Sequence, residues 1–266
     1  MKKVKTTYDN PASFKKSSRI TLIGITKKIV RKQFNGHNHT IKFLISEISN
    51  YFNQLKIANR FYCNLCKKGS PFFLHTSNDK RILRDSICPN CSSRKRHRGL
   101  FEEYKTILNS NEINKILHFA PEPVFYSLFQ NYDYITADFN LEDVDLKLDI
   151  QKNDYKSESF DLILCNHVLE HVEKDFMALE ELERILKPNG LLLLTVPGDW
   201  ERDEIIEFNK PDGNGHYRDY GLDLISILKD NFSKVDLVDL FKYNNVYNLP
   251  IGLTPKHDLA FLCHKV

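Results

Sequence analysis

The stretch FDLILCNHVLEHVEKDFMALEELERILKPNGLLLLTVP, residues 160–197, decides the fold of this chain. It begins with an apolar strand pattern that runs into the polar pair Asn166 and His167 and then into an amphipathic helical pattern. Pro188-Asn189-Gly190 ends that helix, and a second apolar strand pattern, LLLLTV, follows. This order predicts a βαβ unit. Its polar pair lies at the carboxyl end of the first strand, where open α/β sheets bind ligands.

The same alternation continues on both sides of this stretch. It predicts strands at 116–120, 134–138, 160–165, 191–196, 234–241 and 259–264, and helices near 123–130, 174–187 and 221–231. Strands that alternate with helices predict an α/β fold with a doubly wound, mostly parallel sheet. We find no helical pattern between the last two strands and therefore expect them to pair as an antiparallel hairpin at one edge of the sheet.

The first 58 residues form a basic segment with a different character. Residues 1–19 are polar and lysine-rich and have no periodicity, and residues 20–34 fit either a short basic helix or a strand. Residues 40–57 carry apolar side chains at helical spacing behind Thr40, which is suited to an N-cap. We expect an amphipathic helix there, with its apolar face packed on the rest of the protein.

Composition indicates an ordinary globular protein: 266 residues, 41% hydrophobic and 27% charged. No apolar run approaches the roughly 20 residues that span a bilayer. The charged N-terminus has no apolar stretch behind it, which argues against a secretory signal and favours the cytosol.

The net charge of +3 is unevenly distributed. Residues 1–98 hold 22 Lys and Arg against 4 Asp and Glu, whereas residues 99–266 hold 16 against 31. This asymmetry fits either attraction between the two parts or a basic surface for an anionic partner, such as a phosphorylated sugar, a nucleic acid or an acidic lipid headgroup.

Four cysteines in residues 59–98 predict a metal site. Cys63 and Cys66 form one C-x-x-C pair, and Cys88 and Cys91 form a second. Two such pairs suit one tetrahedral Zn²⁺, and four thiolates leave no open position for catalysis, so we expect a structural zinc ribbon. Disulfides are the competing interpretation, but they do not suit a reducing compartment. The remaining two cysteines, Cys165 and Cys263, lie in strand patterns and are expected to be buried.

The basic run Arg94-Lys95-Arg96-His97-Arg98 follows the second cysteine pair. It fits either a phosphate-binding patch or the solvated start of a helix. If the metal fixes this segment, its arginines could hold an anionic group by paired hydrogen bonds.

Residues 99–266 resemble a class I S-adenosylmethionine (SAM) dependent methyltransferase domain with a Rossmann-like, seven-stranded sheet. The resemblance rests on the βαβ stretch above and on polar residues at the ends of the other strands. It implies that Asp138 binds the ribose of SAM with Phe139 beside it, that Asp149 and Ile150 flank the adenine, and that Asn166 and His167 lie near the methionine part.

The first strand–helix turn departs from the family pattern of an acidic residue followed by Gly-x-Gly. Here His118 takes the acidic position, Ala120 the first glycine and Glu122 the second, with Pro121 between them. Side chains at both glycine positions prevent the usual close approach of the backbone to the cofactor. We expect Glu122 to make a contact of its own, to the SAM ammonium group or ribose; otherwise the site does not bind SAM.

Four strings together resemble one bacterial subgroup of these enzymes: CPNCSSRKRHR at 88–98, ILHFAPE at 116–122, CNHVLEHV at 165–172 and HYRDYG at 216–221. This resemblance covers residues 60 to about 240. Its members often accompany enzymes that build cell-surface saccharides, such as capsule polysaccharides. It implies a small acceptor that is sugar-like or anionic, such as a sugar phosphate.

A hydroxyl acceptor needs a base, and histidine suits that role. We expect His216, in the glycine-containing loop 198–220, to be the base, with His167 as a second candidate and His171 as a packed or capping residue. The residues expected to hold the acceptor are Arg96, Arg98, Arg218 and Tyr220. An acceptor whose oxygen is already ionised would need no base.

Two other functions stay open at this point. The basic head and its aromatic residues fit an RNA methyltransferase with a zinc-ribbon RNA-binding module. The altered first turn also fits a non-catalytic binding protein that has lost SAM.

Overall fold

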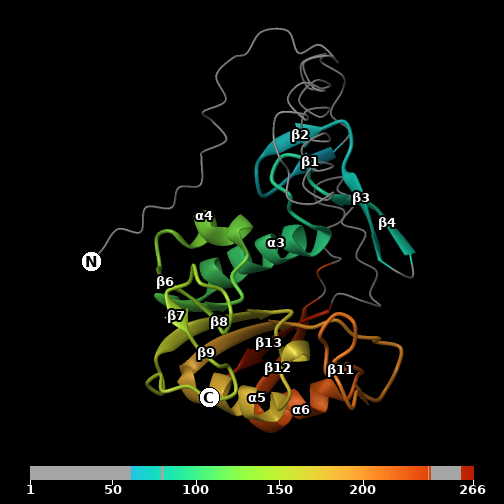
Figure 1. Ribbon diagram of the computed structural model, residues 1–266. Helices are drawn as coiled ribbons and strands as arrows, with labels where there is room; N and C mark the ends of the chain where they lie inside the picture. Colours follow the sequence, from blue (N-terminus) through green and yellow to red (C-terminus); the bar gives the residue numbers. More distant parts are fainter. Residues whose placement is uncertain (1–60, 79–80, 239, 241–258) are drawn as a thin grey trace.

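The computed structural model describes residues 61–78, 81–238, 240 and 259–266. The segments expected at 20–34 and 40–57 lie outside the described residues. At the centre is a seven-stranded sheet (Figure 1). Its strands, in spatial order, are β12 (Lys234–Val238), β13 (Ala260–His264), β9 (Leu186–Thr195), β8 (Phe160–Asn166), β5 (Lys115–Phe119), β6 (Asp133–Asp138) and β7 (Leu146–Lys147).

The sheet is mostly parallel, as predicted. The pairs β9–β8, β8–β5, β5–β6 and β6–β7 are parallel, whereas β13 runs antiparallel to both of its neighbours, β12 and β9. The last two predicted strands therefore pair antiparallel at the edge. Because the parallel strands point the same way, the ends of β5, β6 and β8 meet at one edge of the sheet.

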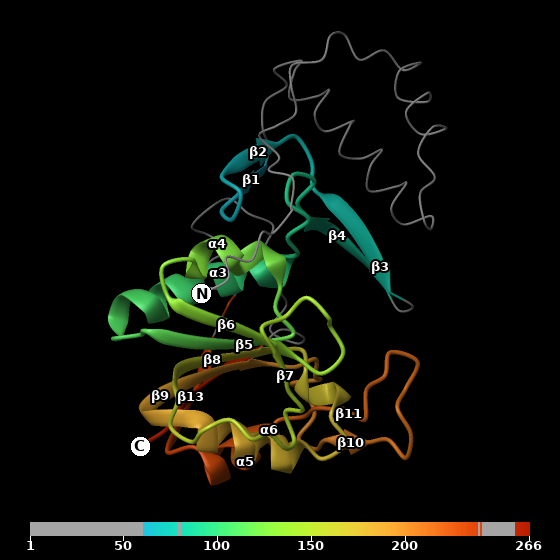
Figure 2. The same ribbon diagram turned by 60° about the vertical axis from the view of Figure 1, so that its left-hand side comes forward.

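Helices cover both faces of the sheet, which makes the fold doubly wound and Rossmann-like (Figures 1 and 2). On one face lie α5 (Asp175–Ile185) and α6 (Leu224–Asn231). The other carries α3 (Lys95–Ser110), the short helix η2 (Pro123–Phe125) and α4 (Tyr126–Phe129). Side chains of β8 alternate between the two cores: Ile163 and Cys165 pack with α5, and Leu162 and Leu164 pack with α3.

Two helices differ from their predicted bounds, and one was not predicted. The helix expected at 174–187 ends at Ile185, because Leu186 already pairs with Phe160 as the start of β9 and the residue before Pro188 disfavours helical geometry. The helix expected at 221–231 begins at Leu224. Helix α3 runs from Lys95 to Ser110, so it crosses the boundary at residue 98 predicted between ribbon and sheet domain.

The cysteine-containing region lies against α3, on that helix's side of the sheet (Figure 2). It consists of two small antiparallel pairs: β1 (Phe61–Cys63) with β2 (Lys68–Ser70), and β3 (Leu74–Asn78) with β4 (Arg81–Ile87). Asn64 fixes it to α3, since its side-chain amide donates to the Arg98 carbonyl at 3.0 Å and to Oε1 of Glu102 at 2.8 Å.

Three short elements lie near the end of β8: η3 (Leu169–His171), β10 (Ile206–Glu207) and β11 (Arg218–Asp219). Strands β10 and β11 pair antiparallel and form the base of the loop between them. No helix among the described residues combines the length and the apolar character that crossing a bilayer requires.

Candidate functional site

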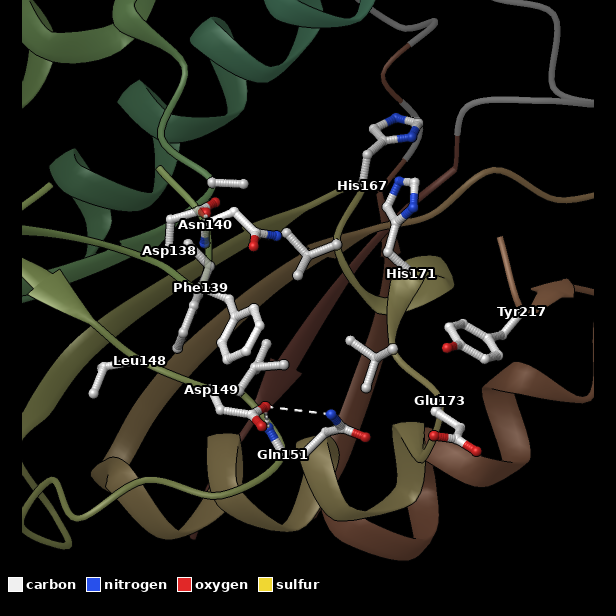
Figure 3. A pocket seen from close by; sticks show the side chains of 15 residues that line it. Asp138, Phe139, Asn140, Leu148, Asp149, Gln151, His167, His171, Glu173 and Tyr217 are labelled. Carbon is white, nitrogen blue, oxygen red and sulfur yellow. Dashed lines mark hydrogen bonds between the residues drawn. The ribbon is translucent and has the colours of Figure 1, made fainter. Parts of the chain in front are cut away.

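A cavity of about 450 Å³ opens at the carboxyl edge of the sheet, where β5, β6 and β8 end (Figure 3). This volume is in the range typical of small-molecule and cofactor sites. Six predicted cofactor-binding residues line it: Ala120, Asp138, Phe139, Asp149, Ile150 and His167. Phe119, Asn140, Leu148, Gln151, Val168, His171, Val172, Glu173 and Tyr217 complete the lining.

Two carboxylates lie on one side of this cavity. Asp138 ends β6, and its Oδ1 accepts the backbone N–H groups of Asn140 and Leu141 at 2.6 and 2.7 Å. Asp149 follows β7, and its Oδ1 accepts the N–H of Gln151 at 2.9 Å. These turns hold both acids at the rim. Between them the wall is apolar, with Phe139 and Leu148 (Figure 3), so the wall suits a flat ring flanked by polar groups.

Ala120 keeps the backbone conformation that a glycine would favour. Its φ of +47° lies in the left-handed region, and its N–H donates to the carbonyl of Ala137 at 2.9 Å. A left-handed conformation costs a non-glycine residue about 1 kcal/mol or more. The chain therefore forms the tight turn after β5 without glycine, and it places the Ala120 methyl group at the cavity.

Glu122, expected to contact the cofactor, does not line the cavity. Its carboxylate belongs to a buried polar cluster behind the turn. One oxygen lies 3.4 Å from Nε2 of His97 and the other 3.4 Å from Nε2 of His118. The amide of Asn166 donates to it at 3.0 Å, and the guanidinium of Arg96 lies at 4.0 Å.

The electrostatics of the cluster keep Glu122 ionised. Burial alone would raise the pKa of Glu122, but His118 and His97 hold that pKa well below its usual value. Nδ1 of His97 accepts the N–H of Arg94 at 3.2 Å, so the ring proton is on Nε2, beside the carboxylate. Burial lowers the pKa of His97, so this neutral tautomer persists at pH 7.

His118, Pro121 and Asn166 are also buried away from the cavity lining. His118 is 0% exposed, with Nδ1 2.8 Å from the hydroxyl of Tyr134. Asn166 donates to the Tyr104 hydroxyl at 2.6 Å and accepts from the Thr195 hydroxyl at 3.2 Å. The contacts of His118 and Asn166 connect the ends of neighbouring strands and the helix beside them.

Of the two histidines expected as bases, only His167 lines the cavity. It follows β8 with φ +51°, and its Nδ1 lies 3.3 Å from Oε1 of Glu170. His216 lies in the loop between β10 and β11, against His171, whose ring is 4.8 Å away between centroids. His171, expected to be a packing or capping residue, lines the cavity itself.

Of the four residues expected to hold the acceptor, three are buried and bonded within the protein: Arg98, Arg218 and Tyr220. Arg98 is 0% exposed and donates to the carbonyls of Ser93 and Ser86 at 2.8 and 3.2 Å. Arg218 is 3% exposed and donates to the carbonyls of Val172 and Glu173 at 2.6 and 2.7 Å. Both guanidinium groups thus donate to backbone carbonyls near the ends of helices and strands.

Tyr220 is 0% exposed and donates its hydroxyl to Asp175 at 3.0 Å. Arg96 remains as the partly exposed cation of the predicted group: its side chain is 25% exposed. It borders a crevice too narrow to hold a water molecule, together with His167, Thr195, Val196, Leu240 and Leu259.

The four cysteine sulfurs converge, and all lie within 4.8 Å of one another. Sγ of Cys63 is 3.7 Å from that of Cys91, and Sγ of Cys66 is 3.8 Å from that of Cys88. Four sulfurs bound tetrahedrally to zinc at 2.3 Å have edges of about 3.8 Å. The donor type and the spacing therefore fit one zinc ion.

The two C-x-x-C turns have the same backbone. In each, the residue after the second cysteine has a positive φ, +57° at Lys67 and +60° at Ser92. Its N–H donates to the carbonyl of the first cysteine at 2.9 Å in both turns. Cys165 and Cys263 are buried in strands, as expected.

Several residues that line the cavity were not predicted from the sequence. Some of these come directly after residues that were predicted. Asn140, Gln151 and Val168 come directly after predicted residues, so a rule that includes the turn after each strand would have found them. Tyr217 and Glu170 carried no such signal, because their position depends on how the 198–220 loop packs on η3.

Part of the sequence that forms this sheet is similar to known proteins. Residues 131–194 match the family model described as a methyltransferase domain. An uncharacterized protein of Methanocaldococcus jannaschii is 32% identical over 112 residues, which are 36% of this chain and 48% of that protein. A hybrid polyketide–peptide synthetase of Chaetomium globosum is 35% identical over 71 residues, 26% of this chain and 2% of that protein. The chain thus spans about half the length of the first relative and a small part of the second.

The solved structures that match this chain are distant from it in both sequence and structure. A SAM dependent methyltransferase from Archaeoglobus fulgidus is 17% identical with a TM-score of 0.46, covering 64% of this chain and 94% of that one. A methyltransferase homologue from Bacillus halodurans is 12% identical with a TM-score of 0.43, covering 62% and 98%. Residue roles do not transfer across matches this distant.

The family match falls on the segment that runs from the start of β6 to the end of β9, the part of the sheet that carries Asp138, Asp149 and His167. Over residues 131–194 this chain is therefore similar to a methyltransferase domain.

Proposed function

We propose that this protein is a SAM-dependent methyltransferase that methylates an oxygen of a small sugar-like or anionic acceptor, such as a sugar phosphate. The observation that carries the proposal is the cavity at the edge of the sheet, with Asp138 and Asp149 on one side and His167 on the other. The domain match over residues 131–194 supports the same class of reaction.

The lining fits a nucleoside cofactor. Asp138 presents a carboxylate suited to the ribose hydroxyls, because one of its oxygens is fixed by two backbone N–H groups and the side chain stays at the rim. The apolar wall of Phe139 and Ile150 suits the adenine, with Asp149 at its edge. Bound SAM supplies a methyl group on a sulfonium, which is already a good leaving group.

The protein's own contribution is to position the acceptor and to remove its proton. We assign the base to His167 in preference to His216, since His167 lines the cavity. Its Nδ1 faces the buried carboxylate of Glu170 at 3.3 Å, and such a partner fixes the tautomer and leaves Nε2 to take a proton. An acceptor with an ionised oxygen needs only positioning.

Arg96 is the residue we assign to an anionic group of the acceptor. Its side chain is 25% exposed and lies beside His167, although it does not line the cavity itself. The buried four-cysteine cluster is inferred to hold a structural zinc ion that fixes the ribbon on α3, and so the start of the helix that carries Arg96.

The test has two parts. Isothermal titration of the full chain with SAM and S-adenosylhomocysteine should show one site. Transfer of labelled methyl groups should then occur with a member of a panel of sugars, sugar phosphates and short RNAs. Absence of binding with both nucleosides would leave a non-catalytic binding protein, and transfer to RNA alone would overturn the small-acceptor assignment.

A further inference from the structure

Two of the distinctive strings in the sequence, CNHVLEHV at 165–172 and HYRDYG at 216–221, meet at one place in the structure. The N–H of Tyr217 donates to the carbonyl of Glu170 at 2.8 Å. Arg218 binds the carbonyls of Val172 and Glu173 just beyond η3. These hydrogen bonds hold the loop between β10 and β11 against η3. His216, in this loop, therefore lies beside His171.

Glu170, His171 and His216 form a group with the donors of a metal site. One ligand atom from each lies within 4.8 Å of the other two. The rings of His171 and His216 are 4.8 Å apart between centroids and inclined by 72°. Two imidazoles bound to one ion at about 2.1 Å have centroids about 5 Å apart, so the two rings already have nearly the spacing of a shared ion.

Each of the two rings has an oxygen atom near its Nδ1, which favours Nε2 as the metal-binding nitrogen. Nδ1 of His171 lies 3.1 Å from the carbonyl oxygen of Gly215, an acceptor, so Nδ1 carries the proton and Nε2 keeps its lone pair. That Nε2 lies 4.0 Å from Oε1 of Glu170. Nδ1 of His216 lies 3.9 Å from a carboxylate oxygen of Asp212, a contact longer than a hydrogen bond. Metal-bound histidines have this kind of oxygen partner on the second nitrogen.

One carboxylate oxygen of Glu170 is left without a hydrogen bond in the described part of the chain. Its side chain is 1% exposed, and its Oε2 has no hydrogen-bond partner among the described residues. The other oxygen, Oε1, faces His167. A buried carboxylate oxygen without a donor costs free energy, and a cation bound to the same carboxylate group would offset that cost.

We propose that Glu170, His171 and His216 bind a divalent transition-metal ion beside the cavity. Two imidazoles and one carboxylate suit Zn²⁺, Co²⁺ or Ni²⁺ and leave coordination positions open, unlike the four-cysteine cluster. His171 belongs both to this group and to the cavity lining, where Figure 3 shows it, so an ion held by the group would border the cavity.

The ion deepens the proposed function, on which this step rests: it takes an oxygen of the acceptor. A bound cation lowers the pKa of a coordinated hydroxyl, so that His167 needs to remove its proton only from an already acidified group. Acceptors with two adjacent oxygens, such as a vicinal diol or a phosphate next to a hydroxyl, would fill two open positions.

Metal titration of the full chain tests the site without any activity assay. Protein already holding one zinc per chain is titrated with Ni²⁺, and bound metal is counted by mass spectrometry after gel filtration. We expect one further equivalent. His216→Gln, in the loop, should weaken it at least tenfold, since one of three ligands is lost. Glu170→Gln should do the same.

His264→Gln is the matched control, because His264 also faces a carboxylate, that of Asp236 at 2.9 Å, but lies on β13. It should retain the second equivalent. Equal affinity of His216→Gln and the parent protein, or no second equivalent at millimolar Ni²⁺, would overturn the site. Nickel binding without any SAM binding would keep the site and remove the proposed function instead.

Discussion

The side-chain amide of Asn166 donates to the carboxylate of Glu122 at 3.0 Å, and this bond joins the end of β8 to the turn after β5. The two residues stand where the family pattern has a polar group and a glycine. In this chain they contact each other instead. The backbone of the turn is thus held by a buried ionised cluster rather than by glycine.

The buried cluster predicts a pH-dependent effect of Glu122→Gln. Folding lowers the pKa of Glu122, so its carboxylate adds stability that is complete above the unfolded pKa of about 4.3 and is lost as the pH falls towards the folded value. At pH 7 the substitution should cost about 1.5–3 kcal/mol, as for the loss of hydrogen bonds to a buried charged group. Below about pH 4 the difference should shrink by about 1.4 kcal/mol per pH unit.

Urea unfolding of both proteins across this pH range measures the difference, and any effect of acid on the cysteine cluster cancels between them. Glu142→Gln is the control, because that side chain is 93% exposed. A constant gap between parent and Glu122→Gln would mean that the carboxylate is not stabilised by its neighbours.

The sequence predicted the sheet well for a physical reason. Strands such as β8 and β9 are buried on both faces, so they appear as continuous apolar runs with clear ends. Helix α3 was not predicted beyond its basic start, because Glu102 and Glu103 interrupt its apolar positions. The spacing of Leu100, Tyr104 and Ile107 was the signal that could have revealed it.

In the candidate site, the sequence predicted only the residues whose position is fixed by the end of a strand. Asp138, Asp149 and His167 follow strands and reach the cavity. The burial of Arg98 and Arg218 could not be predicted, because cationic side chains are mostly exposed and only the folded chain shows which carbonyls need donors. The burial of Glu122 outside the cavity lining could not be predicted either, because its partner His97 lies on α3.

A paired substitution tests the strained turn. Ala120→Gly removes the left-handed strain but gives the unfolded chain more freedom, so stability should change by less than about 1 kcal/mol. Ala137→Gly, at the hydrogen-bonded neighbour in β6, should cost clearly more, because a strand glycine loses both packing and entropy. Chemical denaturation compares them. Equal losses would show that the φ of Ala120 carries no strain.

Asp138→Ala should weaken binding of S-adenosylhomocysteine by about tenfold or more. A buried diol that loses a charged acceptor loses about 1.5–3 kcal/mol. Asp133→Ala lies at the other end of β6 and should leave the affinity unchanged. Isothermal titration gives both values, and unchanged affinity for Asp138→Ala would refute the assignment of β6 to the ribose.

Cys88→Ser should release the zinc ion and loosen the ribbon from α3. The cluster needs four soft donors, and a hydroxyl binds zinc poorly. Cys165→Ser is the control, since that thiol lies in β8 outside the cluster. Metal analysis of purified protein should give one zinc fewer for Cys88→Ser, and retained stoichiometric zinc would contradict a four-cysteine site.

His167→Asn tests the base assigned to the reaction. Asparagine tolerates the positive φ of this position better than most residues, so the turn after β8 should persist. With a neutral hydroxyl acceptor, kcat should fall by about 10²–10⁴-fold, and the rise of kcat with pH that reports loss of the imidazole proton should disappear. His264→Gln should keep both the rate and the pH profile. A purely structural role would lower the amount of folded enzyme without removing that limb of the profile, so the pH dependence separates the two. A variant with the parental kcat and profile would move the base away from His167 or indicate an acceptor oxygen that is already ionised.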